Sequence, residues 1–231
     1  MEFQEHYDRV FAELADLCAA CGRRFEEVTV VAVSKTVGID AVASALQAGC
    51  NDFGENRPDV LAEKAPEFPQ ANWHFIGNIQ SRKIDEIVRY ASLIHSLYQR
   101  DHAEKINAAA RALGKIQPVL LEVNISGEAS KSGMTPEEAC DFAKYVNSFE
   151  NLRACGLMTM APQGDRVVAR QCFEALAALR EAIQQELPAD EALTFNELSM
   201  GMSEDWQEAV LAGATIVRIG RALFSDSFEE K

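Results

Sequence analysis

The sequence has no surplus of positive charge. Its 22 lysines and arginines stand against 36 aspartates and glutamates, which gives a formal net charge of −14 at pH 7. This balance argues against a general nucleic-acid binder and against a peripheral protein on an anionic membrane, because both depend on a basic surface. A small anionic ligand remains compatible with it, since a phosphate site needs only a local arrangement of donors.

Long apolar runs are also missing. No stretch approaches the length of about 20 residues that spans a bilayer. The segment 1–16 is acidic and amphipathic, and it lacks the basic region and apolar core of a secretory signal. We therefore expect a cytoplasmic protein that does not associate with membranes.

Histidine is scarce and cysteine is scattered. Cys18 and Cys21 have the C-x-x-C spacing, but neither a second such pair nor a histidine cluster accompanies them among the six cysteines and four histidines. A zinc or thioredoxin-like site is therefore not expected. Scattered reduced thiols fit a cytosolic protein.

What the sequence does have is a regular alternation of strand-like and helix-like segments. Apolar runs predict strands at 28–33, 52–54, 73–76, 93–95, 118–124, 152–157, 195–198 and 215–219. Helical periodicity and end signals predict helices at 3–21, 39–48, from 56 onward, and at 80–90, 100–113, 135–147, 166–187 and 205–211.

Eight β/α units in a chain of this length predict a (β/α)8 TIM barrel with an extra N-terminal helix. We expect residues 1–231 to form this single domain. A doubly wound sheet is the alternative. It would place a glycine-rich fingerprint after the first strand, where this chain has Ser34, Lys35 and Thr36.

Lys35 stands out at the end of the first predicted strand. A buried ammonium is costly unless it is paired or neutralised, and a lysine that loses its proton can form a Schiff base. The alternative is a lysine just beyond the strand, with its head in solvent. The segment alone leaves both interpretations open.

Two small turns follow the last two predicted strands. One contains Gly201 and the other Gly220, in the position where barrels often bind phosphate. Their alternative role is to make tight turns. Arg218 interrupts the last strand and needs an acceptor, because arginine does not relieve burial by losing its proton. That acceptor is either a structural carboxylate or a ligand between Lys35 and the two turns.

A strand-end lysine, a phosphate turn and an interposed arginine together resemble a pyridoxal phosphate (PLP) site on a barrel. The chain resembles the pyridoxal phosphate homeostasis proteins of the YggS/PROSC type, which are related to the barrel domain of alanine racemase. The motifs that carry this resemblance run in order along nearly the whole chain: AVSKT at 32–36, FGEN at 53–56, WHFIG at 73–77, VNISGE at 123–128, KSG at 131–133, GLMTM at 156–160, LSMGMS at 198–203 and IVRIG at 216–220.

The resemblance implies a role for each matching position. It makes Lys35 the residue that forms the internal aldimine and Arg218 the residue that faces the pyridine nitrogen. The phosphate-holding segments contain Ser199, Gly201, Ser203 and Gly220, and the positions that line the cofactor are Asn56 and Met200. His74 belongs to a matching motif and lies either beside the site or in a structural role.

The chain also departs from the family pattern. Arg221 occupies a position that is often threonine, whose hydroxyl can donate to phosphate. Either the backbone N–H of residue 221 serves instead, with the guanidinium turned away, or the guanidinium itself reaches the phosphate.

The resemblance implies a non-enzymatic protein of intracellular vitamin B6 homeostasis that holds PLP as a Schiff base on Lys35. An arginine at the pyridine nitrogen disfavours the protonated ring and weakens the electron sink that PLP enzymes use. The alternative is a racemase-like enzyme with weak activity, which needs acid/base groups on both faces of its substrate. A cofactor-free Schiff-base aldolase is a third hypothesis, against which the phosphate turns and Arg218 argue.

The racemases that this chain resembles carry a second domain, which forms their dimer and supplies a catalytic tyrosine. Its absence here leads us to expect a monomer without catalytic residues, in transient contact with PLP-dependent apoenzymes. Lys131 lies in the loop after the fifth predicted strand. It is either a solvated loop lysine or a transient acceptor of the cofactor.

Overall fold

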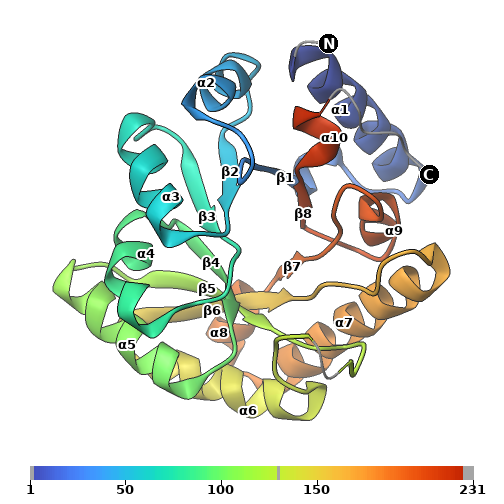
Figure 1. The fold of residues 1–231 in the computed structure, drawn as a ribbon. Helices are drawn as coiled ribbons and strands as arrows, with labels where there is room; N and C mark the ends of the chain where they lie inside the picture. Colours follow the sequence, from blue (N-terminus) through green and yellow to red (C-terminus); the bar gives the residue numbers. More distant parts are fainter. Residues whose placement is uncertain (1–2, 129–130, 226–231) are drawn as a thin grey trace.

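The structure is a computed structural model that describes residues 3–128 and 131–225. Its strands form a closed parallel barrel in the order β1-β2-β3-β4-β5-β6-β7-β8. Figure 1 shows them as a ring with the helices around the outside. The strands are β1 (Thr29–Val33), β2 (Asp52–Glu55), β3 (Asn72–Phe75), β4 (Leu93–Leu97), β5 (Gln117–Glu122), β6 (Leu152–Met158), β7 (Glu197–Ser199) and β8 (Ile216–Ile219).

The helices largely follow the predicted segments. They are α1 (Phe3–Ala20), α2 (Ile39–Gln47), α3 (Pro58–Lys64), α4 (Ile84–Tyr90), α5 (Arg100–Ala112), α6 (Pro136–Asn147), α7 (Arg166–Glu186), α8 (Ala189–Thr194), α9 (Trp206–Leu211) and α10 (Arg221–Phe224). Short 3-10 turns lie at η1 (Phe25–Glu27), η2 (Ala65–Glu67) and η3 (Ser81–Lys83). The predicted (β/α)8 barrel with an N-terminal helix is confirmed. The short helices α8 and α10 were not predicted.

Side chains alternate between the lumen of the barrel and the layer under the helices. On β1 and β8, Val31 and Ile216 belong to a small apolar cluster that they form with Leu120 and Met158. Their neighbours Ala32 and Val217 belong instead to the large core between strands and helices. Because successive residues of a strand point to opposite faces, the small cluster lies in the lumen.

The two ends of the described chain meet on one side of the barrel. Strand β8 pairs with β1, with Arg218 opposite Val31. Helices α1 and α10 lie side by side in Figure 1, and the ring centroids of Phe3 and Phe224 are 5.0 Å apart. Barrel closure therefore brings the last strand next to the first.

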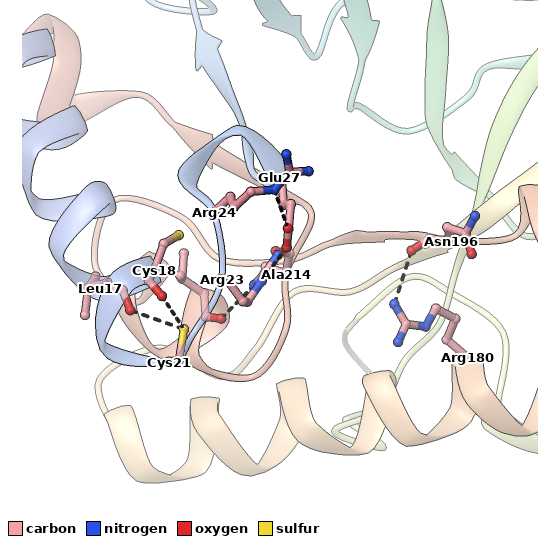
Figure 2. A network of polar contacts seen from close by, with 10 residues as sticks. Leu17, Cys18, Cys21, Arg23, Arg24, Glu27, Arg180, Asn196 and Ala214 are labelled. Atoms are coloured by element: carbon pink, nitrogen blue, oxygen red, sulfur yellow. Dashed lines mark hydrogen bonds and ion pairs between the residues drawn. The ribbon is translucent and has the colours of Figure 1, made fainter.

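The segment that follows α1 is tied to the turn before β8. Arg23 donates to the carbonyl oxygens of Val210 and Ala214, at 3.1 and 2.9 Å. Figure 2 shows this contact beside Cys21, whose thiol donates to the Leu17 and Cys18 carbonyls at the end of the helix. Cys18 is buried and Cys21 is exposed. The C-x-x-C spacing thus marks a helix end.

None of the helices in the described ranges combines the length and the apolar character that crossing a bilayer requires.

Candidate functional site

Lys35 lies two residues beyond the end of β1. Its side chain is exposed in a turn that the Val37 N–H closes by donating to the Ser34 carbonyl, at 3.1 Å. Within the described ranges, the Lys35 ammonium has no hydrogen-bond or ion-pair partner. The structure therefore selects the second of the two positions considered for Lys35, beyond the strand and open to solvent. The amine is accessible to a ligand at the C-terminal ends of the strands.

Ser34, the residue before Lys35, is held in place by two buried side chains. The Ser34 hydroxyl donates to Glu55 Oε1 at 2.6 Å, and the Lys64 ammonium donates to the Ser34 carbonyl at 2.8 Å. The same ammonium also bonds Glu55 Oε1 at 2.6 Å. All three side chains are buried. This cluster on the outer face of the barrel anchors the backbone from which Lys35 projects.

Arg218 is buried in the lumen, on the same side of β8 as Ile216. Its guanidinium donates to Ser199 Oγ at 2.6 Å and to the Thr159 carbonyl at 3.0 Å. No carboxylate of the described residues lies within ion-pair distance of it. Burial lowers the pKa of Arg218 to about 10, and the more distant charges of Asp205 and Glu122 oppose that shift. The guanidinium remains a cation with N–H groups to offer.

The turn after β8 presents backbone donors to an oxygen atom. The N–H groups of Gly220 and Ala222 both point to Ser203 Oγ, at 3.3 and 3.4 Å. The preceding turn needs Gly201, whose φ is +88° and whose added Cβ would lie 2.5 Å from the Ala209 side chain. The two glycine turns therefore converge on one place, where an oxygen acceptor already sits.

Arg221 and Ser199 have side chains engaged elsewhere. The Arg221 guanidinium is 2.7 Å from Glu204 Oε1, with both side chains about half exposed or more. The Ser199 hydroxyl lies in the lumen against Arg218 and His95. Although both residues are adjacent in sequence to the phosphate-type turns, neither side chain is directed to the Gly220 and Ala222 N–H groups.

Asn56 and Met200 flank the site from opposite sides of β1. Asn56 is exposed just after β2, and its carbonyl lies so close to Gly77 that an added Cβ there would be 2.0 Å away. Met200 follows β7 and is buried in the core under the helices. Its side chain therefore faces away from the lumen, and only its backbone adjoins the site.

The lumen holds further polar residues that sequence reasoning did not single out. Glu122 lies on the lumen side of β5, is 2% exposed, and has no hydrogen-bond partner at Oε2. Burial raises the pKa of Glu122 to about 7, an effect that the charge of Arg218 partly offsets. His95 on β4 is completely buried. Both are single ionisable residues within otherwise largely apolar strands, and that is the signal that could have found them.

His74 on β3 is buried among polar partners. Its ring bonds Asp52 Oδ1 at 3.1 Å through Nε2 and His95 Nε2 at 2.9 Å through Nδ1. It therefore belongs to a buried hydrogen-bonded group and reaches the site through other residues. Lys131, by contrast, is on the rim, where its ammonium donates to the Met160 carbonyl at 3.2 Å.

Comparison with known proteins matches this chain over nearly its full length. The family model described as "Alanine racemase, N-terminal domain" matches residues 10–227. A curated protein of Pseudomonas aeruginosa named pyridoxal phosphate homeostasis protein is 39% identical over 223 residues, which cover 95% of this chain and 94% of the relative. The chain belongs to the pyridoxal phosphate homeostasis protein family.

Membership in the pyridoxal phosphate homeostasis protein family is also visible in three dimensions. The solved structure of PipY from Synechococcus elongatus with PLP bound is 31% identical, has a TM-score of 0.80, and is matched over 92% of this chain and 100% of that chain. PipY solved without PLP has a TM-score of 0.87, with 97% of this chain covered. The family resemblance suggested by the sequence motifs is thus confirmed.

Proposed function

We propose that this protein binds PLP covalently through Lys35 and holds it for PLP homeostasis, without turning over a substrate. The observation that carries this proposal is the meeting of three features near the C-terminal ends of β1 and β8. They are the accessible amine of Lys35, the buried guanidinium of Arg218, and the convergent N–H groups after β8. The names of the relatives and the PLP in the PipY structure support it.

The amine of Lys35 would condense with the aldehyde of PLP, with loss of one water molecule. The anchored Ser34 reduces the number of positions that the lysine backbone can take, because the Lys64 and Glu55 side chains hold it. Such preorganisation lowers the entropic cost of binding. PLP supplies the electrophilic carbon, and the protein supplies a positioned amine.

The phosphate would take the place now occupied by the Ser203 hydroxyl oxygen. Backbone N–H groups that converge on an oxygen acceptor form a typical anion cradle. We propose that Gly201, Ser203 and Gly220 hold the phosphate. The guanidinium of Arg221 is paired with Glu204, so residue 221 would take part there only through its backbone.

Arg218 would face the pyridine nitrogen of PLP, and Ser199 would hold the guanidinium from its other side. Asn56 and the backbone of Met200 would line the cofactor. Arginine only donates hydrogen bonds, so it pairs with an unprotonated nitrogen. An unprotonated ring withdraws electrons poorly and stabilises carbanions less. This arrangement favours retention of the cofactor over catalysis.

One observation favours a second candidate, a racemase-like enzyme of low activity. Glu122 faces the lumen with an unbonded oxygen, and burial brings its pKa to about 7, which suits proton transfer near neutral pH. Racemisation also requires a group on the opposite face of the substrate. The carrier proposal expects no turnover despite Glu122.

Cofactor uptake tests the proposal directly. The purified protein with added PLP should show an absorption band of bound cofactor, and Lys35→Ala should abolish it. The variant Lys105→Ala, at an exposed lysine on α5, serves as the control and should leave the band unchanged. A wild-type protein that takes up no PLP contradicts the proposal.

A second experiment separates carrier from enzyme. The loaded protein is incubated with single L-amino acids and the chirality of each is followed over time. Turnover well above that of free PLP would overturn the carrier proposal, and its loss in Glu122→Gln would assign the activity to that carboxyl group. In the carrier role we also propose transfer to PLP-dependent apoenzymes by a monomer, which a transfer assay and size-exclusion chromatography test.

A further inference from the structure

Four hydrogen bonds cross the lumen of the barrel in an unbroken series. Asp52 Oδ1 is 3.1 Å from His74 Nε2, and His74 Nδ1 is 2.9 Å from His95 Nε2. His95 Nδ1 is 2.8 Å from Ser199 Oγ, which in turn is 2.6 Å from the Arg218 guanidinium. The series joins β2, β3 and β4 to β7 and β8. It therefore links one wall of the barrel to the opposite wall.

With both rings neutral, the acceptor-only carboxylate of Asp52 gives these bonds a single direction. Arg218 has only donors, so Ser199 Oγ accepts from it, and the hydroxyl hydrogen of Ser199 remains available to His95 Nδ1. His95 then carries its proton on Nε2 and donates to His74 Nδ1. His74 carries its proton on Nε2 and donates to the carboxylate of Asp52, which as an ion only accepts. In this arrangement both rings carry their hydrogen on Nε2.

Burial protects the middle of the series from water. His95 and Ser199 are fully buried, and His74 and Arg218 are 6% and 4% exposed. Only Asp52 reaches solvent, with 27% of its side chain exposed at the start of β2. Because β2 starts at the N-terminal face, Asp52 lies at the opposite end of the barrel from Lys35. The chain of bonds thus joins the far rim to the residue proposed to face the cofactor.

Neighbouring groups do not supply an alternative partner for the two rings. His74 Nδ1 and Nε2 and His95 Nδ1 and Nε2 all take part in the series. At the rim, Asn72 also donates to Asp52 Oδ1, at 3.2 Å. Near Arg218, the charges of Glu122 and Asp205 act at longer range.

We propose that Asp52, His74, His95 and Ser199 are positioning residues that hold Arg218 in its donor geometry toward the bound cofactor. The series keeps Ser199 as an acceptor and so keeps one Arg218 N–H engaged, while the N–H groups not bonded to Ser199 or Thr159 stay available to a ligand. The role of Arg218 at the cofactor rests on the proposed function. The tautomers of the two histidines are a property of the protein alone.

Nitrogen-15 NMR of the histidine-labelled, cofactor-free protein tests the direction of the series. His74 and His95 should both show a protonated Nε2 and an unprotonated Nδ1 at neutral pH. Asp52→Ala should convert His74 to a mixture of tautomers, because Nε2 loses its acceptor. Asp52→Asn should preserve the wild-type pattern, because the amide oxygen still accepts. His102, which lies outside the series, is the internal reference. Any other tautomer or an imidazolium at either position overturns the proposal, as does an Asp52→Ala variant with unchanged tautomers.

Cofactor retention tests the link to Arg218. Asp52→Ala should weaken PLP retention about 3- to 10-fold and shift the absorption of the bound cofactor. Asn72→Ala, which removes a neighbour of the same carboxylate outside the series, should do neither. Equal effects of the two substitutions would mean that Asp52 acts through local packing at the rim and not through the series of hydrogen bonds. That result would overturn the proposal. Should the wild-type protein bind no PLP, the proposed function fails, while the NMR result still decides the direction of the series.

Discussion

The Lys64 ammonium and the Glu55 carboxylate are 2.6 Å apart, and neither side chain is exposed by more than 4%. This ion pair lies between β2 and α3, directly behind Ser34, to which both partners are also bonded. A buried pair of this kind contributes little net stability compared with an apolar pair, but loss of one partner leaves a buried charge uncompensated. Because both partners also bond Ser34, the loss of either one would disturb the backbone that carries Lys35.

Lys64→Met should lower the free energy of unfolding by about 3–5 kcal/mol, because Glu55 remains buried without its partner. The double variant Lys64→Met/Glu55→Leu should recover most of this loss in chemical denaturation. The surface pair of Lys105 and Asp101, 3.6 Å apart, provides the control. Lys105→Met should cost at most about 1 kcal/mol. An equally small effect of Lys64→Met would mean that Glu55 finds water or another donor.

Glu122 should make stability fall as pH rises. Its pKa is raised from 4.5 to about 7 in the folded protein, so folding favours the protonated form. The free energy of unfolding should therefore decrease by about 3 kcal/mol between about pH 4.5 and 7, where the unfolded chain ionises and the folded protein does not.

Glu122→Gln removes this contribution. Denaturation at pH 5 and pH 8 should show the variant gaining stability relative to wild type at the higher pH. The exposed Glu63→Gln variant should show no such gain. A difference between Glu122→Gln and wild type that stays the same at both pH values would contradict the assignment. His95 acts in the opposite sense, because burial lowers its pKa and stability is lost at low pH.

Gly77→Ala should disturb the loop that carries Asn56. The new Cβ would lie 2.0 Å from the Asn56 carbonyl oxygen and 2.6 Å from its carbon, so the two backbones must separate. We expect a loss of about 1–3 kcal/mol in stability and weaker PLP retention in the same variant. Gly38→Ala, where no atom lies within 4 Å of the added Cβ, should cost about 1 kcal/mol or less. Retention equal to wild type in Gly77→Ala would remove Asn56 from the cofactor site.

Ser203→Ala should weaken PLP retention by about tenfold or more, the size of one hydrogen bond to a charged group. The prediction assumes that the hydroxyl rotates to donate to the phosphate once the anion takes over the N–H groups of Gly220 and Ala222. Dissociation of PLP into excess apoenzyme measures it. Ser148→Ala, at the end of α6, is the matched control. Unchanged retention would show that the backbone donors suffice.

Much of the fold was predictable because each local signal agreed with the barrel. Apolar runs located every strand within about two residues, and alternation with helices predicted the closed parallel sheet. The helix α8 (Ala189–Thr194) was missed because none of its residues is buried, so it has no apolar face that would reveal a helical period. Lys35 was correctly placed at the C-terminal end of the first strand, while its exposure depended on where β1 ended.

The candidate site was predicted less completely, because its side-chain directions depend on strand ends and barrel closure. Ser199 is the last residue of β7 and points into the lumen, so its hydroxyl meets Arg218 although its sequence neighbours form the phosphate-type turn. Asp52, His74 and His95 come together only when three strands pair in register across the barrel. No local pattern reports such contacts.

Closure of the barrel through β1 and β8 has a consequence for protein synthesis. A nascent chain that has emerged as far as β7 already displays Lys35, but it has neither Arg218 nor the turn at Gly220. The proposed site therefore comes into existence only when the last strand docks beside the first. A ligand stabilises only the state that binds it, so PLP would stabilise only the fully folded protein. The absorption of bound PLP would then report the fraction of chains that had completed folding.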